Sequence, residues 1–309
     1  MFDNFFFMAF GFIFLIKGAD ILIKGSSNIA KKFNISDMII GLTIISIGTS
    51  LPELFISITS AIKGNSDISI GNVIGSNICN MLLVLGVSSL IKPLDVNRRS
   101  KFIDIPMTLI YIILFALIVD INPNLSKISG ITLIIFFLFF LFCTIFTQKR
   151  ENSFKEENVN KEYIRILPNV FYIILGIVIL KIGGDWVVDN GVEIAQKMNI
   201  SDKVIGLTII AIGTSLPELI TSITAGVKGK SDMAIGNVLG SSIFNFFLII
   251  GAASIIKPIT YSSSYDYELL LLIVSNLILF LFSVKKDKMT KQNGLIYVLM
   301  YMVYVINLV

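Results

Sequence analysis

Long apolar runs alternate with short polar loops along almost the whole chain. Each run has ~20 residues, the length that an α-helix needs to cross a hydrocarbon core of ~30 Å. The pattern therefore predicts an all-α membrane protein with ten transmembrane helices. We expect these helices near residues 5–23, 38–62, 70–90, 102–119, 131–147, 169–188, 203–227, 235–256, 267–284 and 294–309.

One polar segment interrupts this pattern, at residues 148–168, where charged and amide side chains are concentrated. We interpret it as a solvated linker. It separates a first half, residues 1–147, from a second half, residues 169–309, each with five expected helices. Because five is an odd number, the second half is expected to enter the membrane from the side opposite to the first.

The two halves repeat each other in sequence. With a shift of 165 positions and no gap, 33 of 47 residues are identical between Asn34–Asn80 and Asn199–Asn245. A repeat with an odd number of helices predicts two inverted five-helix repeats. In transporters with this architecture, the substrate site lies near the membrane midplane, where the repeats meet.

The positive charges predict the orientation in the cell membrane. Of the 25 Lys and Arg residues, 18 fall in the loops after the odd-numbered helices and 5 in the opposite loops. Cytoplasmic loops carry the excess of positive charge. We therefore expect both termini outside and the central linker in the cytoplasm.

Composition narrows the possible chemistry. Charged residues make up 15% of the chain, against about a quarter in a soluble domain, and the mean hydropathy is +0.85. The chain has no histidine and only two cysteines, both within apolar runs, which argues against zinc sites and histidine catalysis. The net charge of +4 lies mostly in loops and gives no sign of nucleic-acid binding. We expect no enzymatic activity and no resident cofactor.

Each half holds one carboxylate within an otherwise uncharged helix, Glu53 in the first and Glu218 in the second. Glu53 shares a helix face with Ser46 and Ser50, and Glu218 shares one with Ser215, because these positions are three or four residues apart. Ionisable residues inside a membrane are costly and are functional by default. The two glutamates are therefore the predicted centre of the functional site.

A proline precedes each glutamate, at Pro52 and Pro217. Proline has no N–H group and clashes with the carbonyl four residues earlier, so each helix is expected to kink there and the carbonyls of Gly48 and Gly213 to lose their helical partners. The carbonyls of Thr49 and Thr214 are expected to turn out of the helix as well. Free carbonyls inside a membrane need protein, water or an ion as a partner.

The next helix of each half adds more oxygen atoms. Ser76 and Asn80 are four residues apart and share a face, and Ser241 and Asn245 repeat them. Together the four helices would gather carboxylates, amides, hydroxyls and carbonyls, without a nitrogen ligand. Such all-oxygen sites suit hard cations, with six to eight ligands for calcium and smaller sets for sodium.

The motif GTSLPE at 48–53 and 213–218, followed by GNVIGSN and GNVLGSS, resembles the cation/calcium antiporter superfamily, most closely its prokaryotic sodium/calcium exchangers. The resemblance covers essentially the whole chain. It implies alternating access by sliding of the first and sixth helices. It also implies four cation positions between the second, third, seventh and eighth helices.

The resemblance also assigns ligands. Calcium would meet the carboxylates of Glu53 and Glu218 and the carbonyls of Thr49 and Thr214. The sodium positions would use Ser50, Ser76, Ser215, Ser241, the carbonyls of Ser46 and Ala211, and Asn80 at the middle position. Asn245 stands where some prokaryotic relatives carry Asp. This departure argues against potassium coupling.

The leading prediction is therefore a monomeric secondary antiporter that exchanges sodium for calcium by alternating access, with the two ions and the lipid bilayer as its partners. A proton/calcium exchanger with Glu53 and Glu218 as proton carriers stays open, as does a passive cation channel. In a purely structural alternative, the glutamates would pair with Lys17 or Lys181. The absence of histidine and of an HExxH motif argues against an intramembrane hydrolase.

Overall fold

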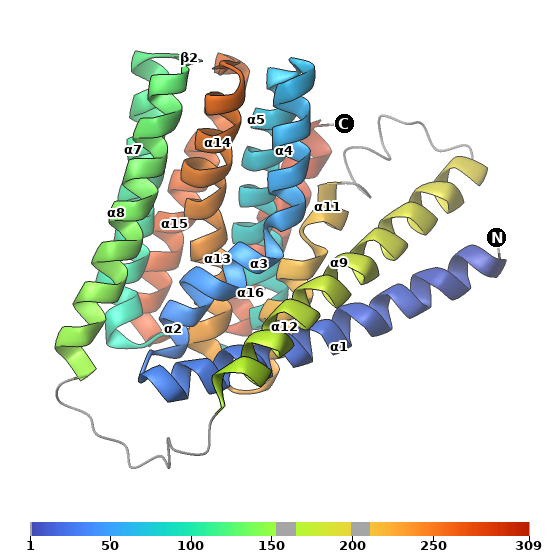
Figure 1. Ribbon diagram of the computed structural model, residues 1–309, viewed down its shortest axis with the longest axis vertical. Helices are drawn as coiled ribbons and strands as arrows, with labels where there is room; N and C mark the ends of the chain where they lie inside the picture. Colours follow the sequence, from blue (N-terminus) through green and yellow to red (C-terminus); the bar gives the residue numbers. More distant parts are fainter. Residues whose placement is uncertain (1, 153–164, 199–210, 309) are drawn as a thin grey trace.

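The computed structural model describes residues 2–152, 165–198 and 211–308, which are helical almost throughout (Figure 1). The first half contains α1 (Phe2–Phe33), α2 (Asp37–Ile40), η1 (Gly41–Ile45), α3 (Ser46–Thr49), α4 (Leu51–Lys63), α5 (Ser66–Ile78), η2 (Cys79–Val84), α6 (Leu85–Ile91), β1 (Leu94–Asp95), η3 (Ser100–Asp104), α7 (Ile105–Ile121), β2 (Asn124–Leu125) and α8 (Lys127–Asn152). The second half contains α9 (Ile166–Lys197), α11 (Ala211–Thr214), α12 (Leu216–Val227), α13 (Ser231–Ile243), η6 (Phe244–Ile249), α14 (Ile250–Ile256), β3 (Ile259–Thr260), η7 (Ser263–Tyr265), α15 (Asp266–Lys286), β4 (Lys288–Met289) and α16 (Lys291–Leu308).

Helix length and composition identify an all-helical membrane protein. Seven helical segments of the described chain are long and apolar enough to span a bilayer, and an eighth is added if Asp37–Thr49 and Leu51–Lys63 count as one bent span. α12 is shorter, and residues 203–210 of the expected seventh span lie outside the described residues. Most of the expected linker, residues 153–164, lies outside them as well. The ten-helix count therefore stays a prediction.

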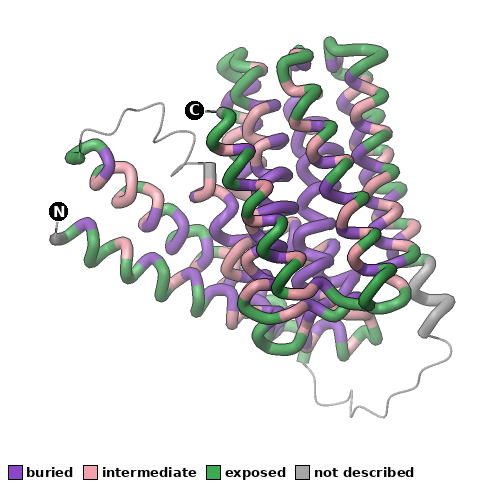
Figure 2. Tube along the Cα trace, turned by 180° about the vertical axis from the view of Figure 1, so that it is seen from behind, coloured by how far each residue is buried: buried purple, intermediate pink, exposed green. Residues whose placement is uncertain are grey.

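Two helical rods form the centre of the molecule. In Ser66–Ile91 and Ser231–Ile256, 72% and 78% of the most apolar window is buried, against 33% in α1 and 28% in α9. Figure 2 shows the same contrast between the buried middle of the bundle and the half-exposed pair of long helices. The second of the two repeated motifs, GNVIGSN and GNVLGSS, thus lies on the helices that the rest of the chain surrounds.

The long helices α1 and α9 run antiparallel and pack on each other through glycines (Figure 1). A Cβ on Gly11 would lie 2.8 Å from the carbonyl oxygen of Gly183, and one on Gly18 would lie 3.0 Å from that of Gly176. The two contacts are exchanged, meaning that each becomes the other when every residue is replaced by its equivalent in the other repeat. Gly11 corresponds to Gly176 and Gly18 to Gly183. The two backbones approach as closely as glycine alone permits.

Polar contacts join the two ends of this pair in the same exchanged manner. At one end, Asn4 donates a hydrogen bond to Glu193 over 2.6 Å. At the other end, Asn28 donates one to Asn169 over 2.8 Å. Asn4 corresponds to Asn169 and Asn28 to Glu193, so each contact is the repeat of the other.

The ion pairs of α1 and α9 are not exchanged. Asp20 of α1 pairs with Lys228, just after α12, at 2.7 Å. Asp185, which corresponds to Asp20, pairs with Lys181 of its own helix at 2.5 Å. Neither Lys17 nor Lys181 pairs with Glu53 or Glu218 in the described part of the chain, so the structural alternative for the glutamates is wrong.

Short strand pairs connect loops that the charge pattern places on a common side. β1 pairs with β4, which joins the loop after α6 to the loop after α15. β2 pairs with β3, which joins the loop after α7 to the loop after α14. The ends of α8 and α9 that flank the linker both lie at the bottom of Figure 1, opposite β2.

Candidate functional site

The two proline turns break their helices at the same place in each repeat. Ser50 and Ser215 leave the helical region, with φ/ψ of −85°/11° and −89°/6°. The helices before and after Ser50 are bent by 50°. Pro52 and Pro217 lie in the first turn of α4 and α12, where a missing N–H is tolerated. The predicted breaks are therefore present in both halves.

Glu53 and Glu218 follow directly in these first turns, and both are fully buried. The Glu218 carboxyl accepts a hydrogen bond from Ser50, three residues before Glu53, so the two glutamate-bearing turns face each other. Two like charges in an apolar interior are costly unless a cation or protons compensate them. The structure thus brings together the two residues that the sequence placed at the centre of the site.

Serine hydroxyls connect the two halves at this point. Ser50 donates a hydrogen bond to Oε1 of Glu218 over 2.8 Å. The Ser50 Oγ also lies 3.0 Å from the Oγ of Ser241. One residue of the first repeat therefore contacts two predicted site residues of the second.

In each half, one asparagine holds the glutamate-bearing helix against the next helix. Asn72 donates hydrogen bonds to the backbone carbonyl of Glu53 over 3.1 Å and to the hydroxyl of Ser57 over 2.8 Å. Asn237 repeats the arrangement in the second half, with distances of 3.4 Å to the carbonyl of Glu218 and 3.0 Å to Ser222. These asparagines were not among the predicted ligands, although their spacing of four from Ser76 and Ser241 was visible in the sequence.

Several buried oxygens of the predicted site residues accept no hydrogen bond from the described residues. They are both carboxyl oxygens of Glu53, Oε2 of Glu218, and the Oδ1 atoms of Asn80 and Asn245. An unsatisfied buried carboxylate costs several kcal/mol. In position and chemistry, this set suits a hard cation.

The described chain has no cluster of three or more His, Cys, Asp and Glu side chains. Any ligand set here must therefore draw on amides, hydroxyls and backbone carbonyls besides the two carboxylates. That composition matches the all-oxygen set predicted from the sequence and suits calcium or sodium better than a transition metal.

Asn80 and Asn245 lie in π-helical segments, η2 and η6, which occupy equivalent positions in the two repeats. The N–H of Leu85 bonds to the carbonyl of Asn80, five residues earlier, and that of Ile250 bonds to the carbonyl of Asn245. π-helical turns often occur at functional sites. The apolar pattern predicts ordinary helices here, because hydrophobic periodicity does not report a single widened turn.

The other predicted site residues lie around this centre. Thr49 lies against Glu218 and donates to Asn237 over 3.3 Å. Ser76 lies beside the Glu53 carboxyl, and Ser215 lies beside the thiol of Cys79. The remaining three are Thr214 at a cavity wall, Ser46 at the start of α3 and Ala211 at the start of α11.

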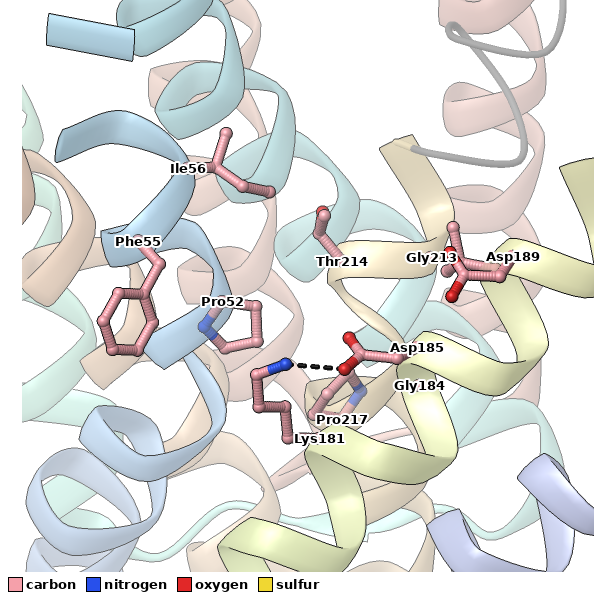
Figure 3. Close-up of a pocket in the computed structure, with 11 residues that line it drawn as sticks. Pro52, Phe55, Ile56, Lys181, Gly184, Asp185, Asp189, Gly213, Thr214 and Pro217 are labelled. Atoms are coloured by element: carbon pink, nitrogen blue, oxygen red, sulfur yellow. Dashed lines mark hydrogen bonds and ion pairs between the residues drawn. The ribbon is translucent and has the colours of Figure 1, made fainter. Parts of the chain in front are cut away.

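A cavity of about 270 Å³ reaches the two proline turns (Figure 3). Pro52 and Pro217, each next to one glutamate, form part of its wall, and the Lys181–Asp185 ion pair faces it. The other lining residues are Phe55, Ile56, Gly184, Val188, Asp189, Gly213 and Thr214. The cavity therefore lies between α9 and the helices that carry the site.

Comparison with known proteins shows similarity over nearly the whole chain. The family described as "Sodium/calcium exchanger protein" matches residues 4–146 and 168–309. An uncharacterised membrane protein of Methanocaldococcus jannaschii is 36% identical, over 96% of this chain and 95% of its own. The sodium/calcium exchanger MaX1 of Methanosarcina acetivorans is 32% identical over 99% and 98%. The solved structure of the sodium–calcium exchanger NCX_Mj without sodium or calcium superimposes with a TM-score of 0.85, at 32% identity and 99% coverage of both chains.

Proposed function

The chain belongs to the sodium/calcium exchanger family and is a sodium/calcium antiporter, and we propose that it exchanges the two ions at the cluster formed by α3–α4, α5–η2, α11–α12 and α13–η6. The observation that carries this proposal is the pairing of Glu53 and Glu218. Both are fully buried, come from equivalent turns of the two repeats and keep oxygens without hydrogen-bond donors in the described chain.

The proposed ligands divide by charge. The two carboxylates and the carbonyls of Thr49 and Thr214 would hold calcium, because a divalent ion balances two negative charges. The proposed sodium ligands are Ser46, Ser50, Ser76, Asn80, Ala211, Ser215, Ser241 and Asn245. All of them belong to one chain, so we propose that a monomer suffices.

Sodium and calcium are expected to compete for this site. One calcium or two sodium ions neutralise the two carboxylates, whereas both sets together would leave excess positive charge in an apolar interior. Sodium should therefore raise the apparent calcium dissociation constant of the purified protein, roughly with the square of the sodium concentration once two sodium ions saturate the site. Titration of calcium at several sodium concentrations measures this effect, with choline as the control cation. Independent binding of the two ions would contradict the shared site, even though the family assignment would stand.

We also propose ten spans in two inverted halves, residues 1–147 and 169–309, joined by the linker at 148–168. The exchanged glycine contacts of α1 and α9 support this proposal, because an antiparallel pair with such contacts has an approximate two-fold axis. The identical hydrogen bonds of Asn72 and Asn237 support it as well. The family match leaves a gap between residues 146 and 168, where the proposed linker lies.

In this proposal α1 and α9 move against the central bundle to expose the site to each side in turn. Two observations support this assignment. With 33% and 28% of their apolar windows buried, α1 and α9 are much less buried than the central spans, and none of the proposed ligands lies on them. The cavity of Figure 3 lies against α9, so a shift of this helix would change access to the proline turns.

Topology gives a direct test of the inverted halves. A cysteine introduced at a position within 151–162 should react with an impermeant maleimide only from the cytoplasmic side, and one added after Val309 only from outside. Both are to be placed in a background without Cys79 and Cys143, which serves as the unlabelled control. Labelling of both positions from the same side would contradict two halves of five spans.

A further inference from the structure

The side chain of Asn77 makes a contact across the two repeats that the proposed ion site does not include. Asn77 is the penultimate residue of α5, and Asn245 lies in η6. The Nδ2 of Asn245 donates a hydrogen bond to the Oδ1 of Asn77 over 3.0 Å. Both residues are fully buried. The bond thus links a residue outside the proposed ligand set to one within it.

In this hydrogen bond the NH₂ end of the Asn245 amide faces Asn77. An amide presents its oxygen and its NH₂ group in different directions, and only the oxygen can bind a cation. With Nδ2 directed at Asn77, the Oδ1 of Asn245 points away from it and has no donor among the described residues. Asn245 follows Ser241 by four residues, and the Ser241 hydroxyl lies 3.0 Å from that of Ser50, which in turn bonds Glu218. The free oxygen therefore belongs to a side chain that shares a helix face with Ser241, the serine in contact with Ser50.

The equivalent position in the other repeat lacks this contact. Residue 242 corresponds to Asn77 and is a serine, whose hydroxyl bonds to the carbonyl of Val238 in its own helix over 3.2 Å. Accordingly, neither polar atom of the Asn80 side chain has a hydrogen-bond partner within the described chain. The two middle amides are thus unequal, since the protein orients Asn245 and leaves Asn80 to be oriented by other groups.

We infer that Asn77 is a positioning residue that holds the carbonyl oxygen of Asn245 toward the cation cluster and thereby sets the apparent affinity for sodium. This inference rests on the proposed function of the cluster. Reversal of both amides would preserve a hydrogen bond between them but would turn the NH₂ group of Asn245 toward the cations, which repel it. Sodium is the affected ion. Two carboxylates dominate the proposed calcium ligand set, so a neutral amide oxygen matters more for sodium than for calcium.

The first test is Asn77→Ser, which introduces the residue found at the equivalent position and is too short to reach Asn245. We expect the sodium concentration for half-maximal calcium release from proteoliposomes to rise about 5-fold, the effect of one buried hydrogen bond. The maximal rate and the calcium dependence should change less than this. The sodium-induced rise in the melting temperature of the purified protein should require correspondingly more sodium. Ser242→Ala is the matched control and should leave the sodium dependence as in the wild type.

The second test separates positioning from a general structural effect. Asn245→Asp replaces the amide with a group that has two equivalent oxygens and no orientation to select. In that background, Asn77→Ser should change the sodium dependence by less than about 2-fold, so the two substitutions are strongly non-additive. In the wild-type background, Asn77→Asp retains an acceptor oxygen for the Asn245 amide. Unlike Asn77→Ser, it should keep the wild-type sodium dependence or strengthen sodium binding.

Equal effects of Asn77→Ser in the two backgrounds would overturn the inference, as would a wild-type sodium dependence in Asn77→Ser itself. If Asn77→Ser does not elute as a folded species, Asn77→Ala takes its place in the same comparison. The wild type separates this inference from the proposed function. If sodium does not displace calcium from the wild-type protein, the shared ion site is wrong, whereas displacement without an effect at residue 77 contradicts only the role of Asn77.

Discussion

Glu53→Gln and Glu218→Gln are each expected to abolish sodium-dependent calcium transport while the protein stays folded. Glutamine keeps the size of the side chain and removes one of the two charges that a buried calcium ion needs. Loss of one charged partner of a buried pair costs about 3–5 kcal/mol, which corresponds to a loss of affinity of about 100-fold or more. Calcium flux into sodium-loaded proteoliposomes measures the effect, and calcium titration of the purified variants shows whether binding accounts for it.

Asp120→Asn is a suitable control for these substitutions, because it makes the same type of change at an exposed residue of α7, away from the site. It should leave flux unchanged. Near-wild-type calcium flux in either glutamine variant would remove that glutamate from the calcium site. Equal loss of thermal stability and flux would instead indicate a structural role for the carboxylate.

Gly18→Leu and Gly183→Leu are expected to reduce transport by about tenfold or more while calcium binding changes by less than about twofold. A Cβ at Gly18 would lie 2.8 Å from the backbone nitrogen of Leu180, and one at Gly183 would lie 2.7 Å from the carbonyl oxygen of Gly11. A leucine must therefore force α1 and α9 apart, since backbone atoms cannot yield as a side chain end can. None of the proposed ligands lies on these helices, so binding should persist while the movement of the pair is impaired.

Gly184→Ala provides the matched control on α9. The nearest atom to a Cβ there is the Cγ of Pro217 at 3.9 Å, an ordinary contact. Flux and binding are both to be measured for all three variants, in proteoliposomes and by calcium titration. Undiminished flux in both leucine variants would contradict a moving role for the α1–α9 pair, and a parallel loss of binding would assign the effect to folding of the site.

Much of the site could be predicted from the sequence because the repeat contains local chemical signals. A proline removes an N–H wherever it stands, so the breaks before Glu53 and Glu218 follow from Pro52 and Pro217 alone. Spacing of three or four residues likewise places Ser50 on the same face as Glu53. The lysines and arginines predict which loops share a side, and each strand pair joins two loops predicted to lie together. Which of the two sides is cytoplasmic stays a prediction.

The remaining features depend on contacts between segments that are distant in the sequence. The hydrogen bond from Asn245 to Asn77 crosses between the repeats. The repeat equivalent of Asn77 is Ser242, so comparison of the two halves does not reveal this bond. The π-helical turns at Asn80 and Asn245 widen the helix locally and leave the apolar pattern intact. The pairing of Asp20 with Lys228 required the packing of α1 on the second half.

That unexchanged ion pair gives the transport cycle a small energetic asymmetry. The glycine and asparagine contacts between α1 and α9 map onto one another when the two repeats are interchanged. They therefore stabilise the two conformations, open to one side of the membrane or to the other, about equally. The Asp20–Lys228 pair favours the conformation in which it forms, but both side chains are 39% exposed. An exposed pair contributes about 0.2–1 kcal/mol, which corresponds to a population ratio of about 1.4 to 5 between the end conformations. Such a bias can change the rate of exchange but not its direction, which the sodium and calcium gradients across the membrane determine.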